Sequence, residues 1–167
     1  MTYYNPVFSF GPGEFCGACA ASGIDGLIIP DLIPEEGQEV EVSAQKRGID
    51  LIYLLPPTST GKRLKLITDR SRGFVYLVSV TGITGARDSL PESLEAFVEN
   101  VRAVSDKPLC VGFGISTPGQ AAQVARFADG VIVGSRIVQS MEADESLAEV
   151  ADFVTGLRRA LDDVDGV

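Results

Sequence analysis

The chain contains 167 residues, with 23 acidic and 14 basic side chains and no histidine, and its net charge is −9 at pH 7. This charge argues against nucleic acid and against an anionic membrane as partners. Because histidine is absent, Ser-His-Asp and Cys-His catalysis and the usual zinc ligand sets are excluded. Acid–base chemistry would then fall to carboxylate, tyrosine or lysine side chains, and we expect no metal site.

Cellular location can also be predicted from composition. No apolar run approaches the ~20 residues that cross a bilayer, and the N-terminus lacks a basic flank followed by an apolar core. The 3 cysteines show no spacing typical of a disulfide framework, which fits a reducing compartment. We therefore expect a cytoplasmic protein.

Apolar stretches alternate with helical patterns along the chain. The opening residues 1–8 are interpreted as the tail of a strand, and further strands are predicted to begin near Gly26, Asp50, Phe74, Leu109 and Val131. Helices are predicted over residues 14–22, 34–47, 62–69, 91–104 and 118–127, with a closing amphipathic helix over 147–161. Strands that are apolar throughout and alternate with helices predict a parallel sheet buried on both faces.

Three of the predicted strands run into glycine. They lead to Gly82-Ile-Thr-Gly85, to Gly112-Phe-Gly-Ile-Ser116 and to Gly134-Ser135. Parallel strands deliver their carboxyl ends to one edge, so backbone N–H groups and helix N-termini would gather there and could bind a phosphate dianion. A dinucleotide fingerprint is excluded, because Gly112-Phe-Gly114 has no third glycine at the required spacing.

The repeated units predict a (β/α)8 TIM barrel rather than an open doubly wound sheet, because the rhythm is even and consecutive strands end in glycine. A complete barrel needs about 250 residues, whereas about five βα units are present. We therefore predict an incomplete barrel that runs from the tail of strand 3 through strand 8 and the closing helix. Residues 1–167 would form a single partial TIM-barrel domain.

Two side-chain groups have structural interpretations. Cys16 and Cys19 have a thioredoxin-type spacing, but no thioredoxin pattern surrounds them, and we expect them to be small core residues of a helix. The carboxylates Glu35, Glu36, Glu39 and Glu41 are expected to form a solvated helix face.

Taken together, the motifs of this sequence resemble those of the tryptophan synthase alpha subunit, from Tyr3 to the last helix. The motifs that carry the resemblance are Tyr3-Tyr-Asn5, Val7-Phe8, the Pro30-Asp31 segment with Glu35-Glu36, Pro56-Pro-Thr58, the segment from Tyr76 to Arg87, Gly112-Phe-Gly-Ile-Ser116 and Gly134-Ser135. The resemblance implies retro-aldol cleavage of indole-3-glycerol phosphate to indole and glyceraldehyde 3-phosphate. It also implies an alpha2beta2 assembly, in which the beta subunit holds pyridoxal phosphate and this chain holds no cofactor.

The resemblance assigns roles to individual residues. Phosphate and substrate binding falls to Gly82, Gly112, Phe113, Gly114, Ile115, Ser116, Gly134, Ser135 and Tyr3. A lid loop is expected at Thr81, Ile83, Gly85 and Arg87, and supporting catalytic roles fall to Thr84, Tyr76 and Asp31. Asp31 could instead cap the loop before the helix at Pro34. Leu32, Ile33 and Pro34 are expected to place apolar side chains near the beta-subunit contact.

The resemblance also has a gap. The family's catalytic glutamate and aspartate lie on the second strand and the loop after it, and neither has a counterpart in this sequence. We therefore expect this chain by itself to be inactive or nearly so, since lost proton transfer alone typically costs about 10²–10⁴-fold.

Two other functions are compatible with part of this sequence. A non-catalytic phosphate-binding module that docks on a beta subunit would keep the glycine loops and lack the acids. A different phosphate-handling barrel is disfavoured by the Tyr3-Tyr-Asn5 and Ile83-Thr-Gly-Ala86 motifs.

Overall fold

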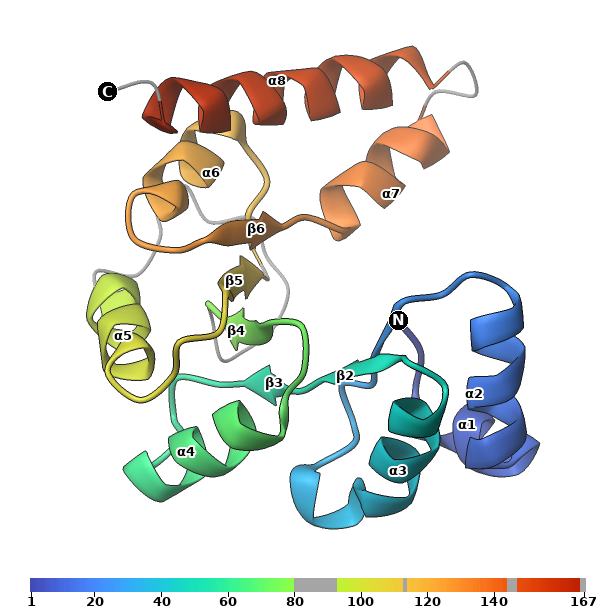
Figure 1. Cartoon of the computed structure of the whole chain (residues 1–167). Coiled ribbons are helices and arrows are strands. Elements are labelled where there is room, and N and C mark those ends of the chain that lie inside the picture. Colours follow the sequence, from blue (N-terminus) through green and yellow to red (C-terminus); the bar gives the residue numbers. More distant parts are fainter. Residues whose placement is uncertain (80–92, 113, 144–146, 166–167) are drawn as a thin grey trace. The chain divides into compact units, whose positions relative to one another are not determined.

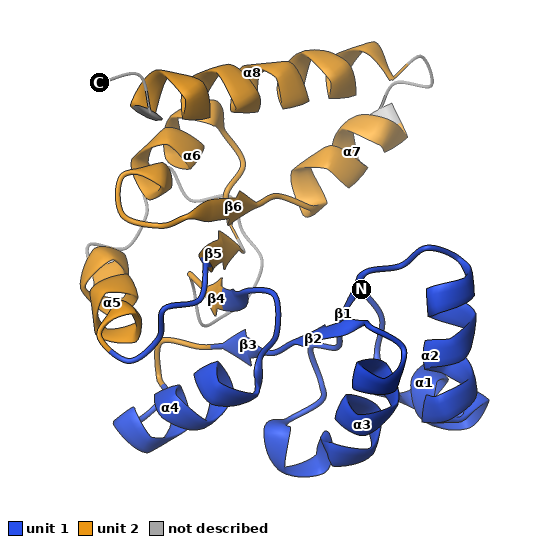
Figure 2. Cartoon of the chain, viewed as in Figure 1, with its two compact units in different colours: residues 1–55, 59–76, 104–108 blue, residues 56–58, 77–103, 109–167 orange. Residues whose placement is uncertain are grey.

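The computed structural model describes residues 1–79, 93–112, 114–143 and 147–165, and the chain forms two compact units within it (Figure 2). Unit 1 comprises residues 1–55, 59–76 and 104–108, and unit 2 comprises residues 56–58, 77–103 and 109–167. Strands and helices alternate along the chain, and each unit is described by itself below (Figure 1).

Unit 1 contains the parallel pair β1 and β2. Its strands are β1 (Gly26–Ile28), β2 (Asp50–Ile52), β3 (Leu54–Leu55) and the first half of β4 (Val75–Val78). Leu27 lies opposite Leu51, and both side chains are buried. The helices are α1 (Tyr4–Phe10), α2 (Pro12–Ala21), the 3-10 helix η1 (Pro34–Glu36), α3 (Gln38–Lys46) and α4 (Gly61–Arg70). β1 and β2 begin at the predicted residues and β4 begins within one residue of its predicted start, whereas the strand predicted from Asp50 is divided at Tyr53 into β2 and β3.

The N-terminal segment differs from the prediction. Thr2 N–H donates to the Ile28 carbonyl at 3.1 Å, so residues beside β1 do pair with it as an added strand would. The pairing is short, however, because Tyr4–Phe10 is a helix and not a strand. Tyr3 is extended at the helix N-cap, and the Tyr4 N–H donates to the Asp31 carboxylate at 2.9 Å. A carboxylate 27 residues away in the sequence therefore accepts a hydrogen bond from a backbone N–H in the first turn of α1.

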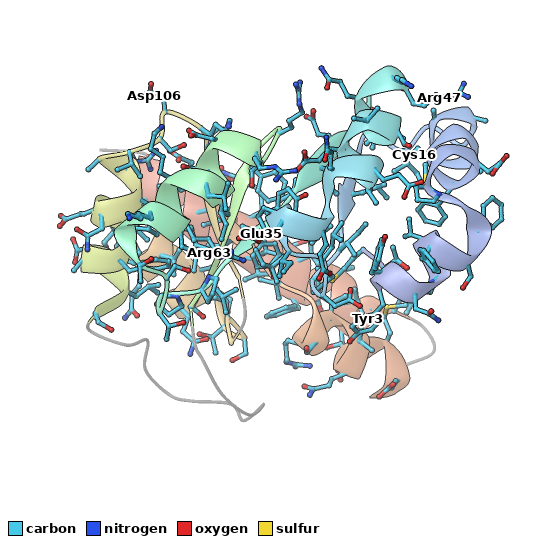
Figure 3. All side chains as sticks on the ribbon, turned by 90° about the horizontal axis from the view of Figure 1, so that it is seen from below. Tyr3, Cys16, Glu35, Arg47, Arg63 and Asp106 are labelled. Carbon is cyan, nitrogen blue, oxygen red and sulfur yellow. The ribbon has the colours of Figure 1, made fainter. Side chains whose placement is uncertain are left out.

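The predicted helix over residues 34–47 is divided at Gly37 into η1 and α3. The prediction that all four of its glutamates are solvated is wrong for Glu41. Glu41 is half-buried, and it accepts hydrogen bonds from the Tyr53 hydroxyl at 2.6 Å and from Arg70 at 2.6 and 2.8 Å. Burial, followed by the hydrogen bond to Glu41, raises the pKa of Tyr53. Glu35 is exposed but pairs with Arg63, and Figure 3 labels both side chains.

Unit 2 contains the second half of β4 together with β5 (Leu109–Gly112) and β6 (Gly130–Ile132). β5 and β6 are parallel, with Val111 opposite Val131 and Gly112 opposite Ile132. Ser79 N–H donates to the Gly112 carbonyl at 3.0 Å beside β5. The helices are α5 (Ser93–Arg102), α6 (Pro118–Ala125), α7 (Ser135–Ala143) and α8 (Ala148–Asp165). α8 packs against α6 and α7.

The predicted helix ends are confirmed where glycine or proline marks them. Gly23 and Gly48 follow α2 and α3 with φ of +74° and +70°, which favours glycine. Thr117 caps α6 and Pro118 occupies its first turn. Among the described residues, no helix is long and apolar enough to cross a membrane.

Gly37 provides a test of packing in unit 1. Its φ of −80° is open to any residue, but a Cβ at Gly37 would lie 1.8 Å from the Tyr53 hydroxyl oxygen. Tyr53 is 1% exposed and bonded to Glu41, so it cannot move aside cheaply. We expect Gly37→Ala to lower the free energy of unfolding in urea by about 1–3 kcal/mol.

The matched control is Gly13→Ala in α2, where a Cβ would meet nothing within 4 Å. This change should raise stability by up to about 1 kcal/mol, because alanine favours helix over glycine. Equal effects at the two positions would contradict the packing argument.

Candidate functional site

The parallel pairing of β5 and β6 brings two of the three predicted glycine loops to the same edge of unit 2. Gly112 ends β5 opposite Ile132, the last residue of β6. The segments 114–116 and 133–135 therefore both follow carboxyl ends of adjacent strands. The third loop, with Thr81, Gly82, Ile83, Thr84, Gly85 and Arg87, lies outside the described residues, as does Phe113.

The loop after β5 turns at Gly114, which is exposed and has φ of +81°. A left-handed backbone of this kind strains residues with a side chain, so glycine is required here. The next residue, Ile115, is 4% exposed and anchors the loop in the core. Within the described part of the chain, the N–H groups of Gly114 and Ile115 donate to no acceptor. They are available to an anion.

Ser116 differs from its two neighbours because its donors are already bound. Its N–H and its hydroxyl both donate to Gln120 Oε1, at 2.8 and 3.2 Å. In return, Gln120 N–H donates to the Thr117 hydroxyl at 3.2 Å. Gln120 was not among the predicted site residues. The pattern Thr-x-x-Gln, typical of a capping box, is the sequence signal that could have identified it.

The loop after β6 leads directly into α7. Gly134 and Ser135 are exposed, and the Gly134 carbonyl accepts from the N–H groups of Ile137 and Val138. Gly134 is therefore the residue that directly precedes α7 and accepts its first backbone hydrogen bonds, and the N–H of Ser135 has no acceptor within the helix. The positive end of the helix dipole faces the same position, which favours an anion.

Among the described residues, Arg136 is the basic residue nearest in sequence to these two loops, and its side chain is engaged elsewhere. Arg136, in the first turn of α7, bonds the Ser140 hydroxyl at 2.5 Å and lies 5.3 Å from the centre of the Phe153 ring of α8. Its charge therefore stabilises the contact of α7 with α8. Any anion at Gly114 and Ser135 would be held by backbone N–H groups.

The predicted residues of unit 1 have different surroundings. Tyr76 is 3% exposed in β4, and burial raises its pKa. Tyr3 is 68% exposed. Asp31 is exposed and bonds the Tyr4 N–H, so the predicted cap of the loop at Pro34 is wrong and the carboxylate caps α1 instead. Of the segment 32–34, only Ile33 is exposed.

Cys16 and Cys19 lie within α2, as predicted, and both are buried free thiols. Burial, and then the neighbouring Cys19, raises the pKa of Cys16, although Arg47 opposes the shift (Figure 3). A raised pKa lowers the thiolate fraction and hence the reactivity. Among the residues that the structure describes, no group of three cysteine, aspartate or glutamate side chains could hold a metal ion.

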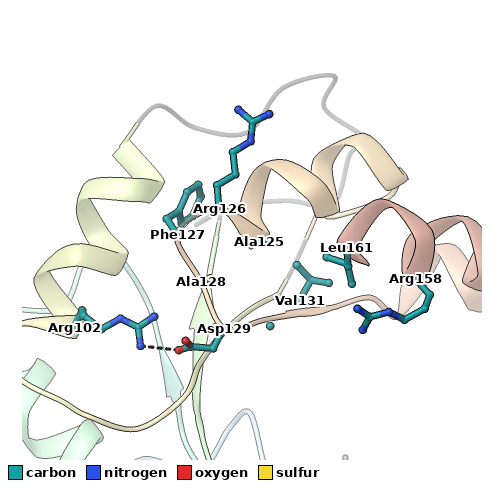
Figure 4. Close-up of a pocket in the computed structure, with 10 residues that line it drawn as sticks. Arg102, Ala125, Arg126, Phe127, Ala128, Asp129, Val131, Arg158 and Leu161 are labelled. Carbon is teal, nitrogen blue, oxygen red and sulfur yellow. Dashed lines mark hydrogen bonds and ion pairs between the residues drawn. The ribbon is translucent and has the colours of Figure 1, made fainter. Parts of the chain in front are cut away.

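A cavity of about 670 Å³ lies at the opposite end of β6 from Ser135. Figure 4 shows Asp129, Val131, Arg158 and Leu161 around it. It is therefore separate from the glycine loops, although it belongs to the same unit.

Asp129, at the edge of this cavity, joins the starting ends of β5 and β6. Its carboxylate accepts from Leu109 N–H and from Arg102, both at 2.7 Å, and its own N–H donates to the Leu109 carbonyl. Burial by itself would raise the pKa of Asp129. The hydrogen bonds from Arg102 and Leu109, with the Arg102 charge, outweigh burial and lower the pKa below its usual range.

Comparison with known proteins identifies the family. The sequence matches the family model described as "Tryptophan synthase alpha chain" over residues 1–162. The chain belongs to the tryptophan synthase alpha chain family. It is 52% identical to the alpha chain of Dehalococcoides mccartyi over 162 residues, which cover 97% of this chain and 64% of the relative.

Solved structures agree with this assignment. Tryptophan synthase from Mycobacterium tuberculosis superimposes with a TM-score of 0.89 at 42% identity and covers 96% of this chain and 61% of that one. The alpha subunit from Legionella pneumophila gives a TM-score of 0.81 at 37% identity, with 96% and 61% covered. The predicted fold class, an α/β incomplete (β/α)8 barrel, is confirmed. The chain spans less than two thirds of the length of these alpha-chain relatives.

Asp129 gives this alpha-chain homologue a testable pH dependence. A carboxyl whose pKa is lowered by folding stabilises the fold above its unfolded pKa of about 4, and that stabilisation is lost as pH falls through the folded pKa. We expect Asp129→Asn to lower the free energy of unfolding at pH 7 by about 1 kcal/mol or less, because the ion pair is partly exposed. The difference from the parent chain should shrink as the pH falls below 4.

Urea unfolding between pH 2 and 7 measures this difference. Asp163→Asn, at an exposed aspartate of α8, is the control for removing a surface carboxylate. A difference between Asp129→Asn and the parent that stays constant down to pH 2 would exclude a role for the carboxylate charge.

Proposed function

We propose that this chain forms the phosphate- and indole-holding part of a tryptophan synthase alpha site, which cleaves indole-3-glycerol phosphate to indole and glyceraldehyde 3-phosphate. The observation that carries the proposal is the pairing of β5 with β6, which brings Gly114, Ile115 and Ser135 to one edge with N–H groups that have no acceptor among the described residues. Family membership supplies the substrate, and the backbone donors supply the physical basis for binding its phosphate.

Backbone donors are sufficient for this task. A hydrogen bond to a charged group contributes about 1.5–3 kcal/mol, so three or four N–H groups support micromolar affinity without a cationic side chain. Net charge does not prevent binding, because local dipoles act at short range whereas distant charges are screened beyond about 8–10 Å. Gly82 of the predicted set would add a further backbone donor.

Cleavage of the carbon–carbon bond needs proton transfer as well as binding. A proton must reach the indole ring carbon and another must leave the neighbouring hydroxyl of the glycerol chain. The resemblance assigns these transfers to a glutamate, with an aspartate on the indole N–H, and predicts no counterpart of either in this sequence. We infer that the chain binds the substrate and does not turn it over by itself, with Tyr76, Thr84 and Asp31 in supporting roles.

The alternative is a non-catalytic module of the same fold that docks on a beta subunit. Exposed aromatic side chains on α1 favour some docking partner: Phe8 is 63% and Phe10 is 60% exposed, beside Tyr3. The Asp31 bond to Tyr4 holds the loop with Ile33 next to this helix. We infer that this surface contacts a beta chain in an alpha2beta2 assembly in the cytoplasm, with pyridoxal phosphate held by the beta chain.

We also propose that residues 1–167 form one partial barrel domain.

Ser135 provides the test of substrate binding. An aspartate at the first residue of α7 should stabilise the helix dipole by about 0.3–1 kcal/mol, yet its charge would repel a phosphate at the same place. We therefore expect Ser135→Asp to keep or raise the melting temperature and to weaken binding of indole-3-glycerol phosphate at least tenfold in calorimetric titration. Ser93→Asp, at the first residue of α5, should leave the affinity unchanged.

The same samples are assayed for indole release. Saturable binding without release supports the proposal. Release by the unsubstituted chain at the rate of its relatives would contradict the inferred inactivity, and equal affinity of Ser135→Asp and the parent would exclude phosphate binding at α7.

The surface that comprises Tyr3, Phe8, Phe10 and Ile33 generates a separate prediction. Aromatic side chains buried in an interface commonly contribute more than 1 kcal/mol each, so Phe8→Ser should weaken binding to the beta chain of Dehalococcoides mccartyi about tenfold or more. The control is Val42→Ser on α3, at a side chain that is 45% exposed and outside the surface. Surface plasmon resonance measures both affinities, and an unchanged affinity of Phe8→Ser would place the contact elsewhere.

A further inference from the structure

We propose that Gln120 is a positioning residue of the phosphate loop: by binding both donors of Ser116 it keeps Ser116 away from the anion and fixes the turn that presents Gly114 and Ile115. The proposal rests on the proposed function, because it assigns the donors of that same site. It removes Ser116 from the predicted phosphate ligands and adds a residue that touches no ligand.

The first argument is the arrangement of donors. In a standard capping box, the glutamine at the third helical position reaches back to the N–H of the N-cap residue. Here Gln120 reaches one residue further, to the N–H and hydroxyl of Ser116 at 2.8 and 3.2 Å. The other half of the box is standard, with Gln120 N–H donating to the Thr117 hydroxyl at 3.2 Å. The loop and the helix are thus connected in both directions.

The second argument is burial. Gln120 is 6% exposed and Ser116 is half-buried. The Gln120 Oε1 atom therefore cannot exchange the N–H and hydroxyl of Ser116 for water. Leaving a buried acceptor without a partner costs about 1–3 kcal/mol. An anion that recruited Ser116 would incur this cost, whereas an anion bound by Gly114 and Ile115 displaces no hydrogen bond found within the described part of the chain. Ser116 therefore stays with Gln120 when the anion binds.

The third argument is the freedom of the turn. Gly114 has φ of +81° and is exposed, and glycine by itself samples many conformations. The turn is held on its helix side by the bonds of Ser116 to Gln120 and by the buried side chain of Ile115. Holding donors in the binding conformation before the ligand arrives lowers the entropy cost of binding. Loss of the Gln120 oxygen should therefore weaken the anion site at a distance.

The test uses this chain and three variants, with inorganic phosphate as the probe. Gln120→Met keeps the length of the side chain and removes the acceptor. Gln123→Met is the control, at an exposed glutamine of the same helix. Ser116→Ala removes the hydroxyl and leaves the N–H bonded to Gln120. Backbone amide NMR gives hydrogen exchange rates without phosphate, and it gives chemical shifts and the dissociation constant during a phosphate titration.

We expect the Ser116 amide to be protected from exchange in the unsubstituted chain and unprotected in Gln120→Met. On titration, the Gly114 and Ile115 amides should shift and the Ser116 amide should not. Gln120→Met should raise the dissociation constant at least tenfold at a temperature where its spectrum remains folded. Gln123→Met should stay within twofold of the unsubstituted chain, and Ser116→Ala, which keeps the shorter bond from the Ser116 N–H to Gln120, should lose less affinity than Gln120→Met.

The outcomes separate this proposal from the proposed function. If the unsubstituted chain shows no saturable shifts, the phosphate site itself is overturned, and the positioning role with it. If it binds phosphate but Gln120→Met binds equally well, the positioning role alone is overturned. A shift of the Ser116 amide on titration as large as those of Gly114 and Ile115 would make Ser116 a ligand and would also overturn the proposal. A purely structural role for Gln120 would lower the melting temperature without changing the dissociation constant.

Discussion

The register between β5 and β6 is the constraint on which the candidate site depends. Gly112 must lie opposite Ile132 for the two following loops to reach the same edge, and a shift along the strand would separate them. Asp129 fixes the register at the other end, because it exchanges hydrogen bonds with Leu109 through its carboxylate and its backbone N–H. Close packing adds to this, since a Cβ on Gly130 would lie 2.9 Å from the Cys110 sulfur. The residues that set the register thus lie at one end of the strands and the donors at the other.

Backbone donors also resolve an apparent conflict between the charge of the chain and its proposed ligand. A chain of net charge −9 is a poor general attractor of phosphate, and three of its described arginines are used in contacts within the protein: Arg70 with Glu41, Arg102 with Asp129 and Arg136 with Ser140. N–H groups at helix starts, unlike arginine side chains, cannot turn away to pair with a carboxylate elsewhere. Their directions are fixed by the turns that carry them. Selectivity would then follow from geometry more than from charge.

Much of the fold and of the candidate site could be predicted from the sequence, and the predictions that were wrong have physical explanations. Strand positions were recovered because buried parallel strands are apolar throughout, and the ends at Gly23, Gly48 and Thr117 because their backbone requirements are local. The helix Tyr4–Phe10 was missed because Asp31, 27 residues away, supplies its first acceptor. Glu41 was misjudged for the same reason: its partners Tyr53 and Arg70 are brought to it only by the fold. Local sequence patterns contain no information on such distant partners.

Gln120 is a different case, because its partners lie within four residues and its pattern is visible in the sequence. The pattern predicts a helix start, and the structure adds that the glutamine reaches one residue beyond the usual acceptor position. That small displacement has a functional consequence when a site is built from backbone N–H groups. Every residue offers such a donor, so a site of this kind is defined as much by the donors that are occupied as by those left free. Because Gln120 Oε1 accepts both donors of Ser116, two adjacent donors are left, on Gly114 and Ile115, and this determines where on the loop an anion can be held.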